Sequence, residues 1–220
     1  MLAKFYSLPD PIVILNDPPS KFSWKKIITN QVSSHWHQRY CDEVSHRSSL
    51  CSLRPAFLPL NGKPHPLWSS CQSSPTAVRA ATIQARILTG RYHTDLLRSK
   101  WDGNDGTCRL PGCGTPEADS VHLLSGQCEA LKPYLNASFQ HNLQSLLDYP
   151  DLHSVTLSLI HGTPFSWVRY LLDPSCEKEV IQISQLKGEE YIWPLFKLSR
   201  SMVWTMHKYR LKMLGLETFV

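Results

Sequence analysis

Three cysteines and one histidine lie close together near the middle of the 220-residue chain. They follow a C-x4-C-x8-H-x5-C pattern within 21 residues and are Cys108, Cys113, His122 and Cys128. Three thiolate sulfurs and one imidazole nitrogen form the tetrahedral ligand set that a structural Zn²⁺ prefers. Because four protein ligands leave no open position for water, the pattern predicts a structural zinc rather than a catalytic one. The alternative is three cysteines, buried or loosely exposed, beside a surface histidine.

The residues between these side chains have the turn and capping types that such a site requires. Pro111 and Gly112 predict a tight turn that brings the first two cysteines together. Asp119 is a candidate N-cap for one helical turn that carries the histidine. Gly126 can end that turn before the last cysteine. We therefore expect a hairpin-like knuckle that leads into a short helix.

The composition is typical of a folded protein from a reducing compartment. Hydrophobic residues make up 42% of the chain. No apolar run is long enough to span a membrane, and prolines and an aspartate interrupt the N-terminus, so we expect neither a membrane segment nor a signal peptide. The seven cysteines are an odd number, and four have no motif spacing: Cys41, Cys51, Cys71 and Cys176. We expect these four to be buried small apolar residues in a cytoplasmic or nuclear protein.

Basic residues are concentrated in two stretches. Residues 76–100 contain five basic residues against one acid, and residues 195–214 contain five basic residues and no acid. This distribution is typical of a surface that binds a polyanion, although two solvated helix faces would give the same pattern. The candidate contacts to nucleic acid are Arg79, Arg86, Arg91, Arg98, Lys100, Lys197, Arg200 and Lys208.

Hydrophobic periodicity predicts helices in most of the chain. The predicted helices span residues 23–49, 76–88, 94–100, 130–147, 152–161, 167–172, 177–186 and 192–214. In the first of these we expect Trp36 to face inward, with His35 and His37 outward, rather than a metal or base-stacking site. Residues 1–20 are predicted to be extended because prolines interrupt them, and residues 53–75 to be an irregular connection.

The expected fold is mostly α, an irregular helical assembly with a small zinc-knuckle insertion and long proline-rich connections. We expect three regions: a helical, thumb-like region at 1–100, the zinc knuckle at 101–135 and a helical tail at 136–220. An apolar stripe in the last helix belongs either to the core or to a partner-facing seam.

No catalytic motif is present in the sequence. The chain has no phosphate-binding glycine loop, no Gly-x-Ser-x-Gly elbow and no adjacent aspartate pair of the polymerase type. His161 and His207 have no evident nucleophile partner. We therefore expect that this chain by itself is not an enzyme and has no small-molecule substrate.

The order of several segments resembles the region downstream of the polymerase domain in non-LTR (LINE-type) retrotransposon reverse transcriptases. These segments are residues 85–92 (ARILTGRY), 94–101 (TDLLRSKW) and 121–128 (VHLLSGQC), followed by the tail at 193–200 and 207–215. Residues 18–24 and the helix of Trp36 also resemble the linker that follows the polymerase palm in that family. In the family, a thumb-like helical segment is followed by a Cys-Cys-His-Cys zinc motif and a variable tail.

The resemblance implies that the four Cys and His residues bind zinc and that Arg79, Arg86 and Arg91 lie near template or target nucleic acid. It also implies that the region helps bind the RNA of the element and its target DNA. This chain departs from the family because the palm, with its catalytic aspartates, and the endonuclease are missing. That departure is typical of a truncated reading frame that starts at an internal methionine.

The sequence therefore favours a zinc-stabilised module that binds RNA, DNA or both, with the missing polymerase core as a further partner. One alternative is a zinc-stabilised protein-interaction module whose stripe at 195–213 docks on a partner. Another is an element remnant with no independent function.

Overall fold

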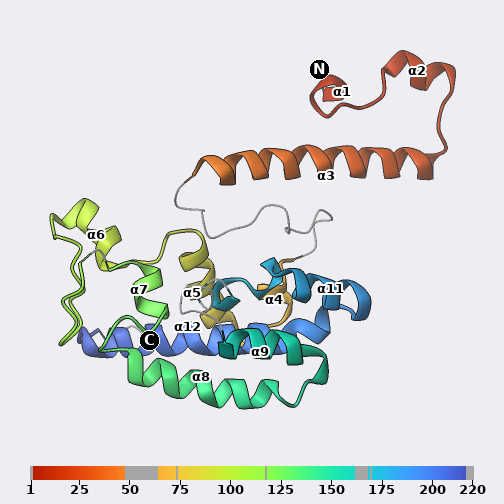
Figure 1. Cartoon of the computed structure of the whole chain (residues 1–220). Coiled ribbons are helices and arrows are strands. Elements are labelled where there is room, and N and C mark those ends of the chain that lie inside the picture. Colours follow the sequence, from red (N-terminus) through yellow and green to blue (C-terminus); the bar gives the residue numbers. More distant parts are fainter. Residues whose placement is uncertain are drawn as a thin grey trace. The chain divides into compact units, whose positions relative to one another are not determined.

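In the computed structural model, the described residues are 2–47, 64–72, 74–116, 118–161, 168 and 170–216. The chain is mostly helical, and none of the described residues forms a strand. The α-helices are α1 (Leu2–Phe5), α2 (Pro11–Asn16), α3 (Lys21–His46), α4 (Pro66–Ser69), α5 (Pro75–Leu88), α6 (Asp95–Asp102), α7 (Ser120–Leu124), α8 (Lys132–Leu146), α9 (His153–His161), α11 (Lys178–Lys187) and α12 (Trp193–Met213) (Figure 1). Short 3-10 helices are η3 (Pro150–Leu152), η4 (Pro174–Cys176) and η5 (Glu189–Ile192). Among the described helices, none is both long and apolar enough to span a bilayer.

The chain divides into two compact units, Met1–His65 and Pro66–Val220. The second unit contains the end of the expected thumb-like region, the knuckle and the tail together. Its last helix, α12, packs against α4, α5, α7 and α8, which come from all three expected regions. The observed boundary therefore falls between residues 65 and 66, whereas the sequence suggested boundaries near residues 100 and 135.

The first unit contains helix where the sequence predicted extended chain. Helix α2 begins with Pro11, and the Asp10 carboxylate caps it by accepting a hydrogen bond from the Ile12 N–H at 2.8 Å. The prediction that prolines block helix formation here was wrong, because proline is tolerated at the first helical position.

Helix α3 confirms the predicted helix at 23–49, but its predicted inward face was wrong. Trp36 is 49% exposed. The His35 ring instead packs between Phe5 and Tyr6, with ring centroids 4.5 Å and 5.1 Å away. The hydrophobic periodicity of α3 does not indicate which of its aromatic rings the N-terminal segment covers.

Helix α12 is the central element of the second unit. In Figure 1 it runs alongside α8, and its contacts with α8 are the most extensive between any two described elements. Four members of the predicted stripe are buried: Leu195, Leu198, Met202 and Met206. These four residues of the stripe are therefore core, whereas Tyr209 and Met213 are half-buried, so most of the stripe is not available as a partner-facing seam.

A buried amide fixes α5 against α12. The two N–H groups of the Gln84 side chain point to the Leu172 carbonyl at 2.7 Å and the Ser199 hydroxyl at 2.6 Å, and the Leu171 carbonyl lies 3.2 Å from the same nitrogen. Gln84 and Ser199 are both completely buried. Hydrogen bonds of this kind offset the cost of burying polar groups and set the register of the two helices.

The predictions for the connection at 53–75 and for the four scattered cysteines are only partly confirmed. The irregular connection at 53–75 lies mostly outside the described residues, but its last part contains helix α4. Cys71 is buried as expected, whereas Cys41 is partly exposed, with its sulfur 3.4 Å from Nε2 of His37. Cys51 and the Cys176 side chain lie outside the described part of the chain.

Candidate metal centre

The four predicted ligands come together in the second unit. The thiol sulfurs of Cys108, Cys113 and Cys128 and a ring nitrogen of His122 all lie within 4.8 Å of one another. The sulfurs of Cys108 and Cys128 are 4.0 Å apart, and the Cys113 sulfur is 3.3 Å from His122 Nε2. Zinc–sulfur bonds of about 2.3 Å in a tetrahedron place sulfur atoms about 3.8 Å apart. The arrangement therefore has the size that one tetrahedral metal ion requires.

A tight turn positions the first two cysteines. The Cys113 N–H donates to the Leu110 carbonyl at 3.1 Å, which closes a four-residue turn. Gly112 is at its third position with φ +77°, a conformation that Pro111–Gly112 supplies in a type II turn. The Cys108 N–H then donates to the Thr115 carbonyl at 2.8 Å, which holds the loop closed. The predicted Pro–Gly turn is thus confirmed.

Helix α7 positions His122. The Asp119 carboxylate caps this helix by accepting a hydrogen bond from the His122 backbone N–H at 2.7 Å, as predicted. After α7, Gly126 has φ +77° and reverses the chain toward Cys128. The Cys128 carbonyl accepts hydrogen bonds from the Leu131 and Lys132 N–H groups at the start of α8. Each ligand is therefore attached to a backbone that local hydrogen bonds fix.

Burial sets the protonation states of these groups. His122 is 4% exposed, and desolvation lowers the pKa of its ring, so the neutral imidazole that binds metals is favoured. Burial raises the pKa of the Cys108 thiol, and that of Cys128 to about 12. In the absence of a cation these two cysteines are therefore protonated thiols at neutral pH. A divalent cation would reverse that preference, because a coordinating thiol is deprotonated.

Metal binding will consequently release protons. We expect at least two protons per bound ion at pH 7, because Cys108 and Cys128 start as thiols and must become thiolates. Titration calorimetry with Zn²⁺ in buffers of different ionisation enthalpy measures this number. Binding that releases no proton would mean that the ion does not bind to thiolates.

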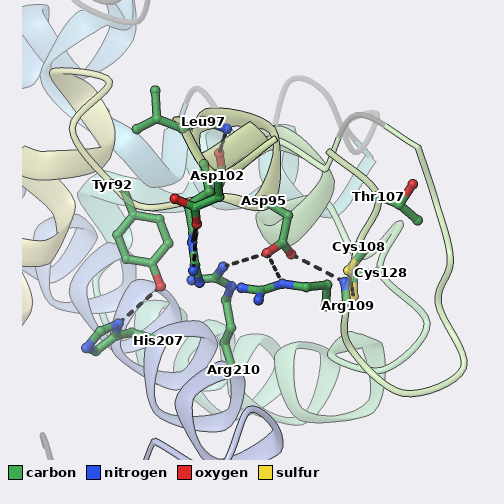
Figure 2. A network of polar contacts seen from close by, with 12 residues as sticks. Tyr92, Asp95, Leu97, Asp102, Thr107, Cys108, Arg109, Cys128, His207 and Arg210 are labelled. Carbon is green, nitrogen blue, oxygen red and sulfur yellow. Dashed lines mark hydrogen bonds and ion pairs between the residues drawn. The ribbon is translucent and has the colours of Figure 1, made fainter. Parts of the chain in front are cut away.

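A buried carboxylate connects the metal-ligand loop to α6 and α12 (Figure 2). Asp95, 3% exposed, accepts hydrogen bonds from Nε of Arg109 at 2.9 Å and from the Arg109 backbone N–H at 3.4 Å. The same carboxylate lies 3.6 Å from the buried guanidinium of Arg210 on α12. Arg109 directly follows the first cysteine in the sequence, so this ion-pair network attaches the candidate metal centre to the helical core.

Tyr92 and His207 lie beside this network. The guanidinium of Arg210 lies over the Tyr92 ring, 5.5 Å from its centroid. The Tyr92 hydroxyl is hydrogen-bonded to His207 Nδ1 at 3.1 Å. Sequence reasoning assigned no role to Asp95, Tyr92 or Arg109. The one available signal was that Asp95 is the single acid within the basic stretch at 76–100.

Six of the eight predicted nucleic-acid contacts are exposed: Arg79, Arg86, Arg91, Lys100, Lys197 and Lys208. Arg98 is half-buried and pairs with Asp102 at 2.8 Å. Arg200 is 6% exposed, and its guanidinium donates to the Ser70 hydroxyl and, at 3.1 Å, to the Ser70 carbonyl. We therefore remove Arg200 from the candidate interface, because burial in the core prevents contact with a phosphate.

The fold and the site together define a mostly helical protein with a Cys₃His cluster able to bind a metal ion. No protein-family model matches the chain, and neither the curated proteins nor the solved structures contain a match to it.

Proposed function

We propose that this chain is a nucleic-acid-binding module stabilised by a structural zinc ion. One observation carries the proposal: the six exposed basic side chains named above have no ion-pair partner among the described residues. All of them belong to the unit that contains the Cys₃His cluster. Unpaired, exposed cations are available to neutralise phosphates, whereas paired ones are not.

The ligand chemistry supports zinc as the ion. Cys108, Cys113 and Cys128 supply soft sulfur ligands, which favour zinc over the oxygen-preferring Mg²⁺ and Ca²⁺. With His122 they fill all four positions of a tetrahedron, so the ion has no vacant site for substrate. Zinc would hold the ligand loop closed and thereby keep Arg109 against Asp95.

The spacing of the cations supports an extended ligand. Arg79 and Arg86 are seven residues apart on α5, a separation that places them on one helix face about 10 Å apart. Lys197 and Lys208 share one face of α12 in the same way, about 16 Å apart. Rows of this length match several successive phosphates of a nucleic-acid strand rather than one small anion.

We further propose that the chain corresponds to the post-polymerase region of a LINE-type reverse transcriptase. The order of elements supports this relationship: α5 ends at the Leu-Thr-Gly step 88–90, α6 follows, and the metal-ligand loop comes next. In that setting the module would bind the RNA of the element and its target DNA, and the polymerase core would be its protein partner.

Binding will be strongly dependent on salt. If about six basic side chains contact phosphates, log K will fall with log [salt] with a slope of about −5 on duplex DNA and about −4 on single strands. Fluorescence anisotropy of a labelled oligonucleotide, measured with the zinc-loaded chain at several KCl concentrations, gives the slope. An affinity that does not change with salt would remove the proposal.

A charge-reversed variant provides the matched test. Arg79→Glu with Arg86→Glu will weaken oligonucleotide binding by at least ten-fold and reduce the salt slope by about two. The control, Lys132→Glu with Lys178→Glu, makes the same change in net charge at exposed positions on α8 and α11. Equal losses in the two variants would show a nonspecific effect of net charge.

A further inference from the structure

A cavity of about 540 Å³ lies beside the Asp95 network, between the end of α5, the segment before α6 and the last turns of α12. Its polar lining is basic and aromatic, with no carboxylate among the described lining residues: Arg86, Tyr92, His93, Arg98, His207 and Arg210. This volume is within the range of about 300–1,000 Å³ that small-molecule sites have. The cavity thus combines several cations with room for a ligand.

The cations of the cavity are held in different ways. Arg210 is 4% exposed, fixed between the Asp95 carboxylate and the Tyr92 ring, and its Nε atom has no hydrogen-bond partner. Arg86 is exposed and makes no ion pair among the described residues. Arg98 pairs with Asp102 but also faces the cavity. One of the lining cations is therefore buried and fixed, and another is exposed and unpaired among the described residues.

The surroundings of His207 support a positive potential in the cavity. Burial lowers the pKa of its ring, and the positive charges of Arg210 and Arg86 lower it further. His207 is therefore neutral at pH 7, and its Nδ1 is hydrogen-bonded to the Tyr92 hydroxyl. An anion entering the cavity meets the unpaired charge of Arg86, whereas Asp102 and Asp95 partly offset the charges of Arg98 and Arg210.

The rest of the lining is apolar. It consists of Ile83, Leu211, Leu214 and Leu216. These side chains suit a flat, weakly polar group, whereas an inorganic anion would leave them in contact with water. The two kinds of lining together match a ligand that combines a phosphate with a planar ring.

We propose that this cavity binds one nucleotide unit of a single-stranded nucleic acid. Arg86 and Arg98 contact the phosphate, Arg210 supplies positive charge behind them, and the base lies against Leu211 and Leu214. This assignment rests on the proposed function, because it takes the nucleotide from a strand. It adds a defined subsite to a surface that otherwise contacts only the backbone of the strand.

The test compares uridine 5′-monophosphate, uridine and inorganic phosphate in calorimetric titrations of the zinc-loaded full chain. We expect the monophosphate to bind at least ten-fold more tightly than either of the other two, because only the monophosphate has both a phosphate for the arginines and a base for the apolar side chains. Arg86→Gln will weaken its binding by about ten-fold, the usual effect of losing one charge-assisted hydrogen bond. Lys178→Gln, at an exposed lysine of α11 outside both the cavity and the proposed interface, will leave it unchanged.

Arg86 is exposed and unpaired, so its substitution does not threaten folding, which circular dichroism verifies. Equal binding of monophosphate and uridine, or equal effects of the two variants, overturns the assignment. A parallel titration with an octauridylate separates the two proposals. Salt-dependent octamer binding without monophosphate binding overturns the cavity site and leaves the proposed function intact. Monophosphate binding without octamer binding overturns both the assignment to a strand and the proposed function.

Discussion

If the cluster binds zinc as proposed, removal of the zinc by a chelator will unfold the ligand loop and destabilise the whole second unit. Structural zinc contributes about 10–16 kcal/mol in small zinc domains, and a typical domain is stable by only about 5–15 kcal/mol. The loop also carries Leu110, Leu123 and Leu124, all buried, so its opening exposes part of the core against α12. Urea unfolding of the full chain, followed by circular dichroism with and without a chelator, measures the loss.

A pair of cysteine substitutions provides the control for this result. Cys113→Ser removes one ligand and will reduce the metal content of the purified protein from about one ion per chain to near zero. Cys41→Ser changes a partly exposed thiol of α3, in the other unit, and will leave metal content and stability unchanged. Full metal content in Cys113→Ser would show that this residue is not a ligand.

The grouping of the four candidate ligands could be predicted from the sequence because all of its determinants are local. The four side chains lie within 21 residues, and the Pro111–Gly112 turn and the Asp119 cap that position them are local as well. Local hydrogen bonds of this kind form whatever the rest of the chain does. The spacing of the four residues and the turn and cap between them were therefore enough to predict that their side chains lie close together.

The same reasoning explains which helices could be predicted. Residues 192–214 and 130–147 were predicted to be helical, and the structure has α12 at Trp193–Met213 and α8 at Lys132–Leu146. Both segments repeat apolar residues at helical spacing over several turns, which is the strongest local signal a sequence gives. The Ser74 and Thr94 caps likewise fix the starts of α5 and α6.

Tertiary contacts explain why the prediction for Arg200 was wrong and why the Asp95 network was not predicted. Arg200 occupies a helix position that would be a plausible phosphate contact, but its guanidinium binds Ser70, far away in the sequence. The Asp95 network is also non-local, because Arg210 is near the end of the chain. Nothing near either residue indicates its partner. The sequence alone therefore does not distinguish a basic residue that is exposed from one that is buried.

Replacement of Asp95 by asparagine will destabilise the second unit by about 3–5 kcal/mol. The substitution keeps the shape of the side chain but removes the negative charge, which leaves the guanidinium of Arg210 buried without a counter-charge. Removal of one partner of a buried ion pair typically costs this much, because the remaining charge stays desolvated. Urea unfolding monitored by circular dichroism at constant zinc concentration gives the difference.

Asp102→Asn provides a matched control on the same helix. Asp102 pairs with Arg98 at 2.8 Å, but the side chains are 42% and 36% exposed, so the loss of this charge will cost only about 0–1 kcal/mol. The double variant Asp95→Asn with Arg210→Met will recover most of the lost stability, because it also removes the unpaired buried charge. Equal effects of the two aspartate substitutions, or no recovery in the double variant, would show that the Asp95–Arg210 pair does not hold the metal-ligand loop to α12.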